Sequence, residues 1–440
     1  MGNHSLEQKE SGGNRSVLRA IGRRYFAVSA EEHAKRNYAY NDSEYNTVIN
    51  SVTTQRRHYL LRDVYDDMML DGVKPQRETF HSLVIGSMKG SRIQDALYFR
   101  DEMKAMGLVP DVAVFNFLIT TCGKCQNADQ AARLLEEMKN YEVKPTGQTF
   151  VCLLNAFAAS GRLDRVLAIV RDMTAAGLGL NRFCYAGLIA AHKNMKPLSS
   201  DVASKIIELV EQSKGWASVD QSKAVAENFM KNIFEEELYN IPTADYVRRR
   251  GGFLNRFLTV YHAAFHAFAD LRNVEAMEIL QDMLRKDGQF PDTFIVMQIM
   301  RCYLRGGKLD RAVEVFNEYI QPGKPAAVDL YLTLIEGAMI GYTPEGMQIA
   351  QDTLAKMNER NFFLSAKSGN DLLLVASGEK TGGFTTANMI WDMMQALKIT
   401  PSLPAAEAYY NGLKEREIPE DDQRLVLVKE TLHNGRGRRV

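Results

Sequence analysis

The chain has 440 residues, of which 45% are hydrophobic and 25% charged, values typical of a folded protein with a sizeable core. Its 54 Lys and Arg residues balance 54 Asp and Glu residues, and the net charge of zero excludes a surface that is basic throughout. Five cysteines are too few, and odd in number, for a disulfide framework, and no run of about 18 apolar residues predicts a membrane span.

The first segment, residues 1–30, has the composition of a targeting sequence. Residues 11–30 contain no acidic residue and four arginines: Arg15, Arg19, Arg23 and Arg24. A basic, amphipathic, Arg- and Ser-rich helix is typical of a mitochondrial or chloroplast transit peptide. Because Glu7 and Glu10 depart from that composition, a disordered N-terminus is the alternative.

Residues 31–191 repeat with a period of 35. Aromatic residues recur at Tyr45, Phe80, Phe115, Phe150 and Tyr185, methionines at Met68, Met103, Met138 and Met173, and prolines at Pro75, Pro110 and Pro145. Each unit carries two apolar stripes at helical spacing, separated by a short break. Neither helix can bury its stripe alone, so the pattern predicts an all-α fold, an α-solenoid of tandem helix-turn-helix repeats of about 35 residues.

The remaining chain is predicted to continue the repeat after an interruption. The register is lost after Tyr185, and residues 192–257 are predicted to be an irregular helical insertion or linker. A second, degenerate array is expected over 258–412, where GGKLDRA at 306–312 repeats SGRLDRV at 160–166. Residues 413–440 are expected to be a tail with a basic end, and we expect eight or nine units in total.

The units at 78–111 and 112–146 resemble the pentatricopeptide repeat family, and the chain is similar to its P-type members from plant mitochondria. The resemblance covers about 44–190 closely and 258–410 more loosely. It implies a helical superstructure that binds single-stranded RNA, with one base per repeat read by two or three side chains. The related tetratricopeptide repeat binds peptides, but the period of 35 and the spacing of Gly107 and Pro110 favour the pentatricopeptide family.

The resemblance also implies which residues face RNA bases. They are the residue after the opening aromatic and the residue after the linker proline, which pair Asn46 with Gln76, His81 with Asp111, Asn116 with Thr146, and Val151 with Asn181. No pair fully matches the combinations that the family uses, and Val151 has no hydrogen-bonding group. We therefore expect RNA contacts at Asn46, His81, Asp111 and Asn116 without a full base-reading code.

Contacts to RNA phosphates are predicted in the insertion. Four arginines, Arg248, Arg249, Arg250 and Arg256, lie there among aromatic residues and without an acid, a composition that suits phosphate contact and base stacking. A solvated loop between two helical arrays is the alternative. The tail HNGRGRRV at 433–440 is a second basic segment.

The sequence contains no recognisable catalytic, metal-binding or cofactor-binding pattern. Cys122 and Cys125 form one C-x-x-C without a second pair, whereas a structural zinc site needs four ligands. His262 and His266 have the spacing of zinc ligands on a helix but lack the neighbouring Glu. Both pairs are predicted to pack within repeat helices, and we expect neither an enzyme nor a cofactor.

These expectations combine into a binding protein of the mitochondrial matrix, with the chloroplast as the second choice. We expect a scaffold in a ribonucleoprotein, a component of the small subunit of the mitochondrial ribosome. Its partners would be ribosomal RNA, contacted mainly through the backbone, and mitochondrial ribosomal proteins. The alternatives are a transcript-specific RNA-processing or translation factor and a tetratricopeptide-like protein adaptor without RNA.

Overall fold

The computed structural model of the protein describes residues 38–215, 233–244, 246, 254–320 and 327–437. These residues form helices and turns without a strand, which confirms the predicted all-α solenoid class. The predicted transit segment, 1–30, lies outside the described residues. The chain divides into two compact units, of which unit 1 comprises 1–178 and 219–240 and unit 2 comprises 179–218 and 241–440.

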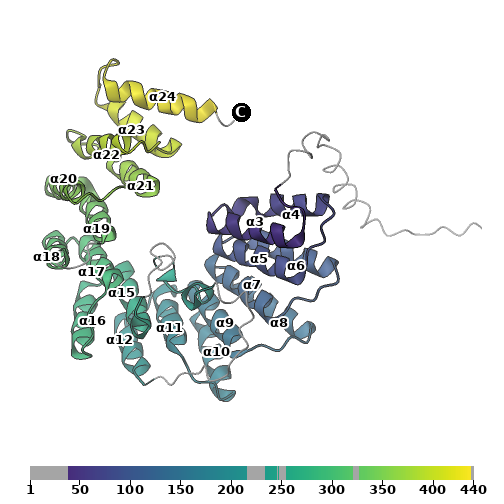
Figure 1. Cartoon of the computed structure of the whole chain (residues 1–440). Helices are drawn as coiled ribbons and strands as arrows, with labels where there is room; N and C mark the ends of the chain where they lie inside the picture. Colours follow the sequence, from purple (N-terminus) through teal and green to yellow (C-terminus); the bar gives the residue numbers. More distant parts are fainter. Residues whose placement is uncertain (1–37, 216–232, 245, 247–253, 321–326, 438–440) are drawn as a thin grey trace, which may run out of the picture. The chain divides into compact units, whose positions relative to one another are not determined.

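Unit 1 contains four helix pairs (Figure 1). In chain order they are α3 (Asp42–Thr54) with α4 (Leu61–Leu70), α5 (Arg77–Lys89) with α6 (Ile93–Ala105), α7 (Val112–Lys124) with α8 (Ala128–Asn140), and α9 (Gly147–Ala159) with α10 (Leu163–Ala175). A short 3₁₀ turn, η1 (His58–Leu60), precedes α4, and the four-residue helix α13 (Glu235–Leu238) also belongs to this unit.

Unit 2 contains six helix pairs and two 3₁₀ turns, η3 (Arg256–Leu258) and η4 (Ile340–Tyr342). The pairs are α11 (Arg182–Asn194) with α12 (Val202–Ser213), α15 (Thr259–Leu271) with α16 (Val274–Lys286), α17 (Thr293–Arg305) with α18 (Leu309–Tyr319), α19 (Val328–Ala338) with α20 (Pro344–Glu359), α21 (Ala366–Ala376) with α22 (Thr385–Ala396), and α23 (Leu403–Glu415) with α24 (Gln423–Gly437). The described chain thus has ten pairs, and the expected eight or nine is too low.

Two helices account for much of this difference. The helix α12 lies inside 192–257, where the sequence predicted irregular structure, and it packs against α11 and α15. Its apolar stripe of Val202, Ile206 and Val210 is buried, but Glu208 stands 35 residues after Met173, where the repeat has methionine. The helix α24 lies inside the predicted tail and packs against α23. Both helices pack as second helices of a pair but lack the landmarks of the period.

The turns between pairs explain the regular period. After α6, the Leu108 amide donates to the Met103 carbonyl, and Gly107 between them has a left-handed φ of 77°. This C-terminal cap favours glycine, because a Cβ penalises the left-handed conformation. The following proline, Pro110, ends the turn, and Asp111 then caps α7 by accepting a hydrogen bond from the Val114 amide.

The helices of each pair occupy two layers with the core between them. In unit 1, the first helices α3, α5, α7 and α9 pack against one another in series, whereas each second helix packs mainly against first helices. The recurring Phe80, Phe115, Met103 and Met138 are fully buried between the layers. The surface of the first helices that faces away from the second helices is hereafter the first-helix face.

Candidate nucleic-acid interface

The structure places the four predicted base-reading residues of unit 1 at the starts of first helices. Asn46, His81 and Asn116 lie at corresponding positions near the starts of α3, α5 and α7, and Asp111 is the N-cap of α7. Only His81 and Asp111 are brought together by a direct contact among these four. Each of the others bonds a different residue, so the four do not converge on one site.

The pair of His81 and Asp111 joins two consecutive repeats. His81 is fully buried, and its Nε2 lies 2.9 Å from Oδ2 of Asp111, which also lies 3.6 Å from the Arg77 guanidinium. Burial of the Asp111 carboxyl raises its pKa, but the hydrogen bond and charge of His81 outweigh burial and lower that pKa overall. Asp111 is therefore a carboxylate that ties α5 to α7.

The side chains of the two asparagines also donate hydrogen bonds to other side chains of the protein. Asn116 is buried, and its Nδ2 donates to Oε1 of Gln148 on the next first helix at 3.1 Å. Asn46 donates to Oδ2 of Asp42 at 3.2 Å, while Oδ1 of Asp42 accepts from Thr79 on α5 at 2.6 Å. The Asn116 side chain thus joins two repeats directly, whereas Asn46 bonds within α3 and is linked to α5 only through Asp42.

Unit 2 repeats the joint at positions that the sequence did not single out as a pair. His262 on α15 is buried, and its Nε2 lies 2.8 Å from Oδ2 of Asp292, the N-cap of α17. The separation of 30 residues equals that of His81 and Asp111. His262 and His266 thus lie on a packed repeat helix, as predicted, and the recurring His-to-Asp interval was the signal available in the sequence.

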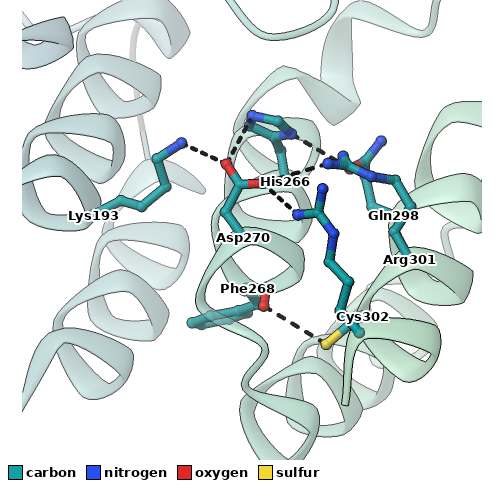
Figure 2. Close-up of polar contacts among 8 residues, drawn as sticks. Lys193, His266, Phe268, Asp270, Gln298, Arg301 and Cys302 are labelled. Carbon is teal, nitrogen blue, oxygen red and sulfur yellow. Dashed lines mark hydrogen bonds and ion pairs between the residues drawn. The ribbon is translucent and has the colours of Figure 1, made fainter. Parts of the chain in front are cut away.

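A charged network lies on consecutive first helices of unit 2, as Figure 2 shows. The Asp270 carboxylate on α15 is approached by Lys193 Nζ of α11 at 2.8 Å and by two guanidinium groups of α17, Arg305 at 3.2 Å and Arg301 at 3.5 Å. His266 Nε2 lies 3.3 Å from the same carboxylate. Three helices therefore share one carboxylate.

The network carries an excess of positive charge. Burial lowers the pKa of His266 to about 4, so the imidazole is neutral near pH 7. Burial raises the pKa of Asp270, but His266, Lys193 and Arg301 together lower it overall, and near pH 7, where His266 is neutral, the cations Lys193 and Arg301 keep the carboxylate ionised. Three permanent cations, Lys193, Arg301 and Arg305, thus surround the Asp270 carboxylate, and a second carboxylate, Glu336, acts on Arg301. The excess of one positive charge attracts a further anion such as phosphate. Sequence reasoning missed these residues, although Arg301 and Arg305 are spaced to share a helix face.

Most of the arginines that the sequence predicts to contact phosphate lie outside the residues that the structure describes. Arg248, Arg249 and Arg250 are outside the described residues, and Arg256 is described only as the first residue of η3. Nearby, Tyr246 packs edge-on against Phe294, with ring centroids 5.7 Å apart. The basic cluster therefore stays a prediction.

The remaining candidates for chemistry are packed in helices. Cys122 is buried in α7, and burial raises the pKa of its thiol to about 12. Cys125 is the C-cap of the same helix, and both are free thiols. Among the helices that the structure describes, none is both long and apolar enough to cross a bilayer.

Helix pairs stacked within each unit, with their first helices in contact in series, define an α-solenoid repeat protein. The family model described as the pentacotripeptide-repeat region of PRORP matches residues 32–196, and the PPR repeat model matches 296–322. A mitochondrial pentatricopeptide repeat-containing protein of Arabidopsis thaliana is 63% identical over 430 residues, which are 98% of this chain and 97% of that protein. The chain belongs to the pentatricopeptide repeat family, and its mitochondrial assignment is confirmed.

More distant similarities cover smaller parts of the relatives. A chloroplastic pentatricopeptide repeat-containing protein of Arabidopsis thaliana is 25% identical over 174 residues, covering 38% of this chain and 19% of that protein. The crystal structure of the pentatricopeptide repeat protein PPR10 in complex with an 18-nt psaJ RNA element is 16% identical, with a TM-score of 0.40 over 91% of this chain and 58% of that chain. PPR10 is a maize protein.

Proposed function

We propose that the protein is a non-catalytic RNA-binding scaffold of a mitochondrial ribonucleoprotein, and specifically a structural component of the small subunit of the mitochondrial ribosome. Membership of the pentatricopeptide repeat family supports RNA as the partner. The net charge of zero supports a protein held among neighbours rather than one that grips RNA over its whole surface.

The observation that carries the proposal is a contrast between two sets of polar residues on the first helices, of which one bonds within the protein and the other stays partly exposed. The predicted base-reading side chains of His81, Asp111 and Asn116 bond other side chains of the protein, and His81 and Asn116 are buried. By contrast, Arg301 and Arg305 in unit 2 keep 26% and 36% of their side chains exposed beside the Asp270 carboxylate. Such a surface favours contact with the phosphate backbone over recognition of base edges.

RNA contact is tested with a labelled 20-nucleotide oligouridylate and fluorescence anisotropy at several salt concentrations. Replacing Arg301 and Arg305 with alanine removes about two phosphate contacts and flattens the slope of log K against log salt by about 1.4. The matched control replaces Arg285 and Arg311, exposed arginines on the second helices α16 and α18, and leaves the slope unchanged. Equal slopes for both double variants would exclude the network as the RNA contact.

The ribosomal assignment is tested by sedimenting a mild mitochondrial lysate before and after ribonuclease treatment. A scaffold of the small subunit co-sediments with that subunit and is released by ribonuclease and high salt together. Sedimentation as a free protein in the untreated lysate would reject the ribosomal role. Ultraviolet crosslinking of the native protein then separates the remaining possibilities, since a protein adaptor without RNA gives no crosslinked RNA.

A further inference from the structure

A short segment of the chain, Phe234–Asn240, lies on the first-helix face of unit 1. It contains α13, which packs against α7 although it follows α7 by more than a hundred residues. The second helices and the neighbouring first helices already contact the other sides of α7. Glu237, Leu238 and Tyr239 are each no more than 5% exposed, so the segment is embedded rather than loosely attached.

The backbone of this segment is held by side chains of two consecutive first helices. Thr120 of α7 donates from its hydroxyl to the Leu238 carbonyl at 2.6 Å. The Cys152 thiol of α9 lies 4.0 Å from the same oxygen. Thr120 and Cys152 are themselves almost completely buried. Displacing the segment would therefore expose the Thr120 hydroxyl as a donor on the first-helix face.

The Glu237 carboxylate of this segment lies between two lysines that occupy the same position in consecutive repeats. Lys89 ends α5 and Lys124 ends α7, one period of 35 residues apart, and the Nζ of each lies 3.8 Å from a carboxylate oxygen of Glu237. The carboxylate is 5% exposed, and a buried charge is tolerated where opposite charges compensate it. Glu237 thus occupies a position where two consecutive repeats present cations to one anion.

We propose that Lys89, Lys124 and Thr120 form an anion site that binds either the Glu237 carboxylate of the chain itself or a phosphodiester of single-stranded RNA. The inference rests on the proposed RNA-binding function. Glu237 and RNA exclude each other, because both need the same lysines on the same face. Unit 1 is therefore held closed by its own segment, while the network of Lys193, Arg301 and Arg305 in unit 2 keeps 18–36% of its side chains exposed and is not covered by such a segment among the described residues.

The test measures oligouridylate binding by the full chain as wild type, Glu237→Gln and Glu236→Gln. Glu237→Gln removes the carboxylate charge that Lys89 and Lys124 face, so a phosphate can take its place, binding at about 0.1 M salt tightens by about 25-fold and the salt slope steepens by about 1.4. Glu236→Gln removes the same formal charge from α13 without breaking the pairs with Lys89 and Lys124, and it binds like wild type. Adding Lys89→Ala and Lys124→Ala to Glu237→Gln abolishes the gain.

A second variant, Thr120→Val, tests the same site independently, in case Glu237→Gln does not fold. Thr120→Val removes the hydroxyl that holds Leu238 and nearly preserves side-chain shape, and it is expected to tighten binding as well and to speed amide exchange in 235–240. Equal affinities of wild type, Glu236→Gln, Glu237→Gln and Thr120→Val overturn the anion site but leave RNA binding intact. If no variant, wild type included, binds RNA, the proposed function and this inference both fail.

Discussion

The joint between His81 and Asp111 gives the sharpest stability prediction, because Asp111 has two separable roles. Asp111→Ala removes the N-cap of α7, which costs about 1 kcal/mol. It also removes the Asp111 oxygen that accepts from the buried Nε2–H of His81, which costs a further ~1–3 kcal/mol. The expected loss is about 2–4 kcal/mol, confined to the helices that the residue joins.

Hydrogen exchange followed by mass spectrometry is the suitable assay, since repeat arrays open locally and a single unfolding free energy is poorly defined for them. Peptides from α5 and α7 should exchange about 30- to 1000-fold faster in Asp111→Ala, because about 1.4 kcal/mol corresponds to tenfold. Peptides from α17 and α18 in unit 2 serve as the internal reference.

The matched control is Asp111→Asn, whose single side-chain oxygen still accepts from the Val114 amide, while its Nδ2 amide donates to His81 Nε2 once the imidazole carries its proton on Nδ1. It should lose less than about 1 kcal/mol, because asparagine caps a helix nearly as well as aspartate. Two results would refute the view that Asp111 joins the repeats: exchange rates in Asp111→Ala equal to those of wild type, or equally faster exchange in both variants. Asp111 would then again be a candidate for contact with an RNA base.

Three further changes test the turns, the helix packing and the acid response. Glu142 adopts φ of 58° where the neighbouring turn has Gly107, so Glu142→Gly should stabilise α8 and α9 by up to about 1 kcal/mol in local hydrogen exchange. Gly107→Ala, whose new Cβ meets no atom within 4 Å, should destabilise α6 and α7 by about 1 kcal/mol through the backbone alone. A Cβ on Gly123 would lie 3.0 Å from the backbone of α9, so Gly123→Ala should cost about 1–3 kcal/mol by the same measurement; a neutral result would mean that α7 and α9 are not closely packed. Burial raises the pKa of Asp292, but its contacts with His262 and with the backbone amides of Ile295 and Phe294 lower that pKa overall. The helices α15 and α17 should therefore lose stability as the pH falls below about 4, and Asp292→Asn should make their stability less dependent on pH when it is measured from about pH 3 to 6.

The repeat architecture was predictable because its determinants are local. Apolar stripes at helical spacing define the two helices of a unit, and Gly107 with Pro110 defines the turn between units. Each signal lies within one period, so the sequence displays it directly. Where the local landmarks were missing, as at Glu208 in α12, the helix was assigned to an irregular segment although its buried stripe makes it a regular member of the stack.

The use of the polar residues was decided only by tertiary structure. His81 meets Asp111, and Lys193 meets Asp270, only after neighbouring helix pairs have stacked, and Thr120 meets the Leu238 carbonyl across 118 residues. The free energy of such contacts depends on distance in space and on burial, which no local pattern encodes. The sequence by itself thus determined that helices form pairs and that the pairs stack, whereas the packing decided which polar groups of the first helices bind one another and which stay exposed to a partner.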